Sequence, residues 1–268
     1  MLKIIKGTLL FCFIVIITPV LSQNTEYKEV HELSYRQDGD DYSKQQCLLD
    51  ISYPVAVEDA PVVVWFHGGG LTGGHREVPE VLTKKGVVVV GVGYRLSPRV
   101  EVVDCIDDAA AAVAWVIKNI SKYNGDPNKV FVSGHSAGGY LVSMIGFDRS
   151  WLQKYGVQAD QLAGLIPFSG HTITHFTERE KRGIPGTQAI VDSLAPLYHV
   201  RKDAPPTLLI TGDRELEMLG RYEENAYFYR MLKVVGHPEV DIMEMQGYDH
   251  GMTYPAFPIL LKFIKNGL

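Results

Sequence analysis

A serine flanked by two glycines is the residue of this chain best suited to nucleophilic chemistry. Ser136 lies between Gly134 and Gly138, after the apolar, β-branched run 129–133 and before apolar residues at helical spacing. This pattern predicts a strand, a sharp turn and a helix, with the serine at the strained tip of the turn. Glycines at the flanking positions let the strand and the helix approach closely. We expect the amide of Ala137 to face the oxyanion of a substrate.

A serine hydroxyl needs a base within hydrogen-bond reach, and the base needs a carboxylate that fixes its tautomer. His250 follows the last expected strand, 240–245, in a glycine-bounded turn, and we predict it as the base. Asp213 follows the expected strand 207–210, and we predict it as the acid. Asp213 is also suited to cap a helix expected at 215–235, so Glu215 and Glu217 remain alternative acids.

The loop after the expected strand 61–66 reads His67-Gly68-Gly69-Gly70. Successive glycines let backbone N–H groups approach a tetrahedral intermediate without a clash of side chains. We predict that the amides of Gly69, Gly70 and Ala137 form an oxyanion hole. A flexible glycine loop without such a role is the alternative interpretation.

These motifs, together with Gly93-Tyr94-Arg95-Leu96-Ser97-Pro98, resemble the carboxylesterase branch of the α/β-hydrolases related to hormone-sensitive lipase. Within it, the chain is most similar to compact bacterial acetylesterases and feruloyl-esterase-like enzymes. The resemblance implies hydrolysis of short-chain acyl esters through an acyl-enzyme, without a metal or organic cofactor. It also implies an Asp-Pro-Leu acid motif, which here reads Asp213-Arg214-Glu215-Leu216, and a large amino-terminal cap, for which residues 23–44 are too few.

Alternating strands and helices predict an α/β fold: a mostly parallel central sheet with helices on both faces and a small cap or none. Residues 45–268 form the predicted hydrolase domain, after a flexible leader at 23–44. We expect helices at 76–85, 103–123 and 254–265 and an antiparallel edge strand at 47–53. The segment 171–201 is expected to cross the carboxyl edge of the sheet, where His171 and Phe176 would wall the substrate pocket. A metal site at His171 and His175 lacks a third ligand, so we predict none.

The amino terminus combines Lys3 and Lys6 with an apolar run and small residues before position 23, which is typical of a secretory signal peptide over 1–22. We therefore expect a secreted or periplasmic protein without stable membrane insertion, since Pro19 interrupts a run already short for a span. The net charge of −5, without a basic block, argues against nucleic-acid binding. Cys47 and Cys105 follow the signal, and either a disulfide or two free thiols fits the sequence.

Three functional hypotheses follow. The first is a secreted serine esterase that acts on acetyl or aryl esters, with carbohydrate as a candidate carrier of the acyl group. The second uses the same residues on an amide, as an arylformamidase or an exopeptidase does. The third is a binding protein on an inactive hydrolase scaffold, which would be expected to lack part of the triad. The substrate in each case is a small molecule or oligosaccharide, and the oligomeric state stays open.

Overall fold

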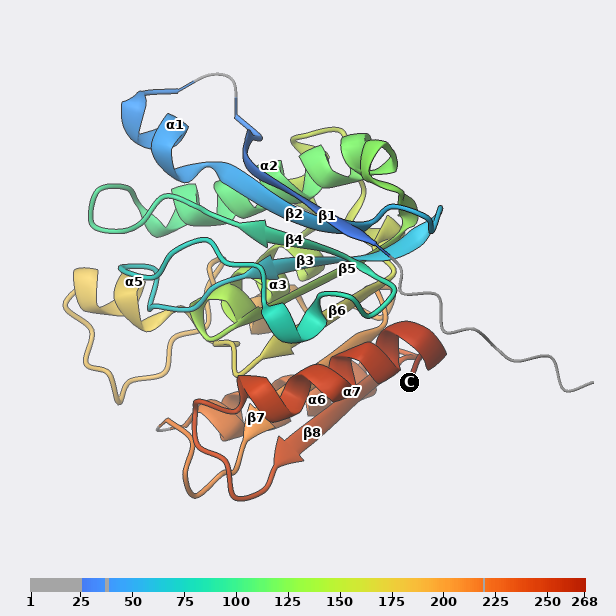
Figure 1. The fold of residues 1–268 in the computed structure, drawn as a ribbon. Helices are drawn as coiled ribbons and strands as arrows, with labels where there is room; N and C mark the ends of the chain where they lie inside the picture. Colours follow the sequence, from blue (N-terminus) through green and yellow to red (C-terminus); the bar gives the residue numbers. More distant parts are fainter. Residues whose placement is uncertain (1–25, 37–38, 219) are drawn as a thin grey trace, which may run out of the picture.

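The computed structural model describes residues 26–36, 39–218 and 220–268, and the expected signal peptide lies outside these residues. One eight-stranded sheet runs through the molecule in the order β1-β2-β4-β3-β5-β6-β7-β8 (Figure 1). The strands are β1 (Tyr27–Ser34), β2 (Leu48–Pro54), β3 (Ala60–Phe66), β4 (Val88–Val92), β5 (Gly125–His135), β6 (Gly164–Phe168), β7 (Thr207–Gly212) and β8 (Val240–Met245).

Six strands, β3 to β8, pair in parallel, and β2 joins β4 antiparallel. Parallel strands are covered on both faces, so their sequences are continuously apolar. All of β4 is buried, and Val62, Val63 and Val64 of β3 are fully buried in succession. The mostly parallel sheet predicted from the alternating elements is therefore confirmed.

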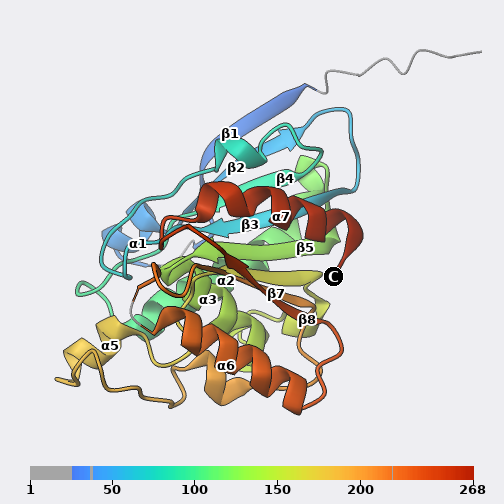
Figure 2. The same cartoon turned by 90° about the horizontal axis from the view of Figure 1, so that it is seen from below.

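Helices cover both faces of this sheet (Figure 2). On one face lie α2 (Val102–Asn119), α3 (Ala137–Phe147) and α6 (Arg221–Val234), and on the other α7 (Thr253–Asn266) packs with the short turn η1 (Glu80–Leu82). The shorter helical segments are α1 (Asp41–Gln46), α4 (Arg149–Gln153), α5 (Phe176–Lys181), η2 (Ile120–Tyr123), η3 (Ala159–Gln161) and η4 (Pro196–His199). The long helix expected at 103–123 is thus α2 followed by η2.

Three predictions for the amino-terminal half of the chain are wrong. The leader expected to be flexible at 23–44 contains β1 and the start of α1, because β1 is held by backbone pairing to β2 rather than by a buried face. This pairing makes β1 the edge strand in place of β2. The helix expected at 76–85 is reduced to η1, which Pro79 precedes as the N-cap residue.

Of the residues described, no helix is long and apolar enough to cross a membrane.

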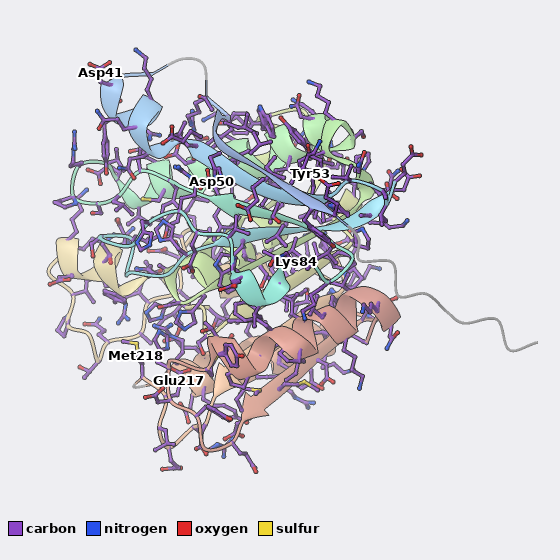
Figure 3. All side chains as sticks on the ribbon, in the orientation of Figure 1. Asp41, Asp50, Tyr53, Lys84, Glu217 and Met218 are labelled. Atoms are coloured by element: carbon purple, nitrogen blue, oxygen red, sulfur yellow. The ribbon has the colours of Figure 1, made fainter. Side chains whose placement is uncertain are left out.

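The start of α6 matters most for the site. A helix was expected from residue 215, but α6 begins at Arg221 after Gly220, whose φ of 71° is left-handed. The segment between β7 and α6 is therefore a loop on the carboxyl side of the sheet. Glu217 and Met218 lie beside each other at this end of the molecule (Figure 3).

Candidate active site

The nucleophile turn has the geometry that the sequence predicts. Ser136 joins β5 to α3 with φ 56° and ψ −112°, a conformation that costs a non-glycine residue free energy. A Cβ at Gly138 would lie 2.1 Å from the carbonyl oxygen of Phe66, and one at Gly134 would lie 2.7 Å from the same atom. Both glycines are therefore needed for β3, β5 and α3 to meet beneath the serine.

His250 lies in the loop between β8 and α7, where its ring is fixed by a carboxylate. Its Nδ1 is 2.5 Å from Oε1 of Glu217. This contact leaves Nε2 as the ring nitrogen that can act as a base. No hydrogen bond joins the imidazole to Ser136 Oγ among the residues described, and in serine hydrolases this bond often tightens only when the substrate binds.

Glu217 is the carboxylate that the structure brings to His250. Its side chain is fully buried and accepts from four donors. Besides His250, the amide of Met218 donates to Oε1 at 2.8 Å. The hydroxyl of Ser169 (2.5 Å) and the amide of Gly212 (3.0 Å) donate to Oε2. Burial raises the pKa of the Glu217 carboxyl, but the hydrogen bonds from His250, Ser169 and Met218 outweigh burial and lower this pKa to about 2.

Asp213, predicted as the acid, does not contact His250. Its carboxylate accepts from the amides of Gly247 at 2.8 Å and Glu215 at 3.0 Å, which lower its pKa. Asp213 thereby fastens the loop before His250 to the end of β7. The delayed start of α6 explains this arrangement, because it lets the chain turn back and place Glu217 under the imidazole.

Two further residues hold Glu217 in place. Ser169, directly after β6, is fully buried with φ 44°, and this conformation aims its hydroxyl at the carboxylate. The guanidinium of Arg221, at the start of α6, donates to the carbonyl oxygen of Ser169. The sequence analysis missed both residues. The position of Ser169 at the carboxyl end of a buried strand was the available signal.

The imidazole of His135 lies beside His250, the predicted base. Nε2 of His135 lies 2.7 Å from the carbonyl oxygen of His250, and the two rings lie 4.6 Å apart. Burial, together with the charge on His250, lowers the pKa of His135 to about 4, so its ring is neutral at pH 7. A neutral ring that donates from Nε2 fixes the backbone of the His250 loop.

The glycine loop passes close to the nucleophile. A Cβ at Gly68 would lie 3.4 Å from Cβ of Ser136. Gly69 and Gly70 have φ values of 111° and 66°, and their amides donate to no atom of the described residues. The carbonyl of Gly69 accepts from the amides of Thr72 and Gly73, which closes the loop into a tight turn. The amides of Gly69 and Gly70 therefore remain free for a ligand.

Two residues of helix α5 contact this glycine loop. The hydroxyl of Thr177 donates to the carbonyl oxygen of Gly70 at 2.5 Å. The ring of Phe176 lies so close that its Cζ would be 2.9 Å from a Cβ at Gly70. Phe176 therefore lies beside the predicted oxyanion hole, as expected of a pocket wall. Thr177 is a further contact that the sequence analysis missed.

His171 lies behind Phe176 and is buried in a charged network. Its Nδ1 is 2.8 Å from Glu224 Oε2, and its Nε2 accepts from Arg221 at 2.9 Å. Burial lowers the pKa of His171, although the hydrogen bond to Glu224 opposes this. Both ring nitrogens are bound within the protein, so His171 supports Phe176 and presents no free nitrogen to a substrate.

The remaining sequence questions concern thiols and metal ions. Cys47 and Cys105 are buried free thiols, which decides between the two alternatives left open. Within the described residues, no group of three or more His, Cys, Asp or Glu side chains is arranged to hold a metal ion.

Comparison with known proteins places these motifs in a family. The family model described as BD-FAE matches residues 49–182, half of the chain. Esterase LipC of Mycobacterium tuberculosis is 27% identical over 239 residues, which are 80% of this chain and 58% of LipC. Carboxylesterase NlhH of the same species is 37% identical over 97 residues, 34% of this chain and 30% of NlhH. The chain thus spans about 58% or less of these two relatives.

Solved structures agree on the fold. A truncated carbohydrate esterase from gut microbiota superposes with a TM-score of 0.75 at 17% identity, covering 92% of this chain and 98% of that one. Apo esterase 2 of Thermogutta terrifontis has a TM-score of 0.68 at 22% identity, covering 90% and 92%. At these identities the likeness concerns the fold, and it confirms the predicted α/β-hydrolase architecture. With the glycine loop, the nucleophile turn and the family match in agreement, this chain belongs to the BD-FAE family of α/β-hydrolases.

Proposed function

We propose that the protein is a serine esterase that hydrolyses short-chain acyl esters through an acyl-enzyme. The observation that carries this proposal is the contact between the buried carboxylate of Glu217 and the imidazole of His250. A strained serine at the turn after β5 and a glycine loop whose amides at 69 and 70 donate to none of the described residues accompany it. The names of the relatives, esterase LipC and carboxylesterase NlhH, support the same reaction class.

In the first half of the reaction, Ser136 Oγ attacks the ester carbonyl carbon while His250 Nε2 takes the hydroxyl proton. Glu217 orients the imidazole and stabilises its charged form, the role first predicted for Asp213. The carbonyl oxygen becomes an oxyanion, which the amides of Gly69, Gly70 and Ala137 stabilise. The carbon–oxygen bond to the alcohol then breaks, and the proton passes from His250 to the leaving alcohol.

In the second half, a water molecule attacks the acyl-enzyme and gives its proton to His250. The carboxylic acid leaves as the bond to Ser136 Oγ breaks, and the proton returns to that oxygen. No metal ion or organic cofactor takes part in this scheme. Phe176 walls the site beside the oxyanion hole, and acetyl or aryl esters, including those on carbohydrate, are the proposed substrates.

The test compares the purified protein with Ser136→Ala on p-nitrophenyl acetate, butyrate and octanoate. We expect turnover to fall with acyl length and the variant to act no faster than the buffer. Rapid quenching with acetate ester should give a peptide that contains Ser136 and carries one extra acetyl group by mass spectrometry. Equal activity in the variant would refute the esterase assignment, and faster turnover of a formanilide or a peptide would favour an amide hydrolase.

We also propose that the protein is exported, on the evidence of residues 1–22 alone. Expression in a bacterial host followed by amino-terminal sequencing of the exported form should give a start close to residue 23. Retention of residues 1–22 in a cytoplasmic product would refute this proposal.

A further inference from the structure

Arg221, the first residue of α6, is a buried charge between two parts of the proposed site. The residue is 2% exposed, and its guanidinium donates in two directions. Its Nη1 donates to the carbonyl oxygen of Ser169, and its Nη2 donates to Nε2 of His171 at 2.9 Å. Ser169 and His171 both follow β6, but their side chains contact different parts of the site.

The first direction leads to the acid. Ser169 has a φ of 44°, a left-handed conformation that costs a non-glycine residue free energy. Its hydroxyl donates to Oε2 of Glu217 at 2.5 Å, and Oε1 of the same carboxylate contacts His250. The guanidinium on the carbonyl oxygen of Ser169 holds the backbone in this costly conformation. Arg221 therefore acts on Glu217 through one intermediate residue.

The second direction leads to the wall of the pocket. The rings of His171 and Phe176 lie 5.5 Å apart, edge to face. Nδ1 of His171 is bound to Glu224, so both ring nitrogens are held by residues of α6. Phe176 in turn lies against Gly70 of the predicted oxyanion hole. The same guanidinium thus fixes the ring on which Phe176 packs.

The fold does not satisfy Arg221 completely. Its Nε is buried and donates to none of the described residues. Burial lowers the pKa of the guanidinium, while the carboxylates of Glu224 and Glu217 raise it. An arginine that only stabilised the fold would be expected to have all its buried donors paired. The unpaired Nε therefore favours a role in which the positions of Nη1 and Nη2 matter most.

We propose that Arg221 is a positioning residue for two parts of the site at once. Through Ser169 it orients the acid Glu217. Through His171 it places Phe176 beside the oxyanion hole. The inference rests on the proposed esterase function and adds to it the residue that ties proton transfer to the fit of the acyl group.

The test is a double-mutant cycle on p-nitrophenyl acetate and butyrate. Ser169→Ala removes only the contact to the acid. Because a hydrogen bond to a charged group is lost, we expect kcat to fall about 10- to 100-fold on both esters, with KM unchanged. Arg221→Lys replaces a planar fork with a single ammonium, which cannot bind Ser169 and His171 together.

For Arg221→Lys we expect a fall in kcat similar to that of Ser169→Ala. We also expect the ratio of kcat/KM for butyrate to that for acetate to change about threefold or more, because the pocket wall moves. Ser169→Ala should leave this ratio unchanged. Arg230→Lys, the same change at an exposed position of α6, is the matched control.

The double variant tests the first route. Ser169→Ala combined with Arg221→Lys should lower kcat no further than Arg221→Lys alone, because both act on the same carboxylate. Multiplied losses would overturn the route through Ser169. His171→Asn interrupts the second route without removing the buried charge, so it should also change the ester ratio. An unchanged ratio in both His171→Asn and Arg221→Lys would overturn the route through His171.

A second variant at Ser169 separates positioning from folding. Ser169→Gly removes the same hydroxyl but relieves the left-handed strain. It should therefore melt at a higher temperature than Ser169→Ala and have the same kcat. A kcat that follows the melting temperature instead would indicate a purely structural role and overturn the proposal.

A substrate-independent reaction separates this proposal from the proposed function. Phosphorylation of Ser136 by diisopropyl fluorophosphate, followed by intact mass, needs the same base and acid but no ester. If the unaltered protein reacts with this reagent but hydrolyses neither ester, the proposed function fails. A slower reaction of Arg221→Lys would still support the positioning role, and a rate equal to that of the unaltered protein would overturn it.

Discussion

Of the three carboxylates that follow β7, the exposed Glu215 makes no contact with His250, and the structure gives the other two different surroundings. Asp213 is bound to backbone amides of the loop that leads to His250, whereas Glu217 is buried against the imidazole itself. A buried carboxylate with four donors stays ionised, and an ionised partner is what an imidazole needs in order to accept a proton from serine. We therefore propose Glu217 as the acid because of its hydrogen bonds, although Asp213 lies closer to the end of the strand.

The first prediction concerns this pair. Glu217→Gln keeps the shape of the side chain but removes its charge. Without the carboxylate, the imidazole is no longer held in the tautomer that carries its proton on Nδ1 and leaves Nε2 free to act as a base. We expect kcat on p-nitrophenyl acetate to fall about 10³- to 10⁴-fold, the effect typical of losing the carboxylate of such a triad. Asp213→Asn is the matched control, and we expect a loss of less than about tenfold because it only weakens a loop contact. A larger loss in Asp213→Asn than in Glu217→Gln would reverse the assignment.

At the scale of elements, the glycine loop depends on α5 for its shape. Thr177 is the contact between them, through the carbonyl of Gly70. Thr177→Val should lower kcat about 10- to 100-fold, with a smaller change in KM, because a displaced oxyanion hole weakens binding of the transition state more than that of the substrate. Thr177→Ser keeps the hydroxyl and should retain most of the activity. Retained activity in Thr177→Val together with a loss in Thr177→Ser would indicate that the methyl group, not the hydroxyl, is what matters.

The close approach of β3 and α3 gives a second prediction at this scale. A Cβ at Gly138 would clash with the backbone of Phe66. Backbone atoms within a central strand cannot move aside as the end of a flexible side chain can. Gly138→Ala should therefore destabilise the fold by about 1–3 kcal/mol or more, seen as a lower midpoint of urea unfolding. Gly186→Ala is the control, since a Cβ there has nothing within 4 Å. An unchanged midpoint for Gly138→Ala would show that the two elements can separate without cost.

The elements were predictable where burial on both faces imposes an apolar run, as in β3, β4 and β5. The turn at Ser136 was predictable because only glycine fits at 134 and 138. The edge strand β1 was not, since its pairing uses backbone atoms that any sequence supplies. The start of α6 depends on the left-handed Gly220, and the residues before it resemble a helix in composition. Because the start of this helix was predicted too early, Asp213 was chosen as the acid instead of Glu217, the residue that contacts His250.

For the whole molecule, buried titrating groups make stability depend on pH. The pKa of His135 is about 4 when folded against an ordinary 6.5, so the unfolded chain binds a proton that the folded one does not. Stability therefore falls as the pH drops from 6.5 towards 4. Glu217 adds a further fall between its ordinary 4.5 and about 2. We expect the urea midpoint of His135→Gln to depend less on pH between 6.5 and 4 than that of the unaltered protein, and an identical dependence would contradict this assignment.

Strand β8, which leads into the loop of His250, lies at one border of the sheet and pairs with β7. Borders of sheets fray at temperatures where their centres are still paired. On heating, we expect activity to be lost at a lower temperature than the circular dichroism signal of the fold. On cooling, we expect turnover to return at once. Amide hydrogen exchange should be faster in β8 than in β5, which ends next to Ser136. The temperature at which activity is lost would then report the local opening of this border of the sheet.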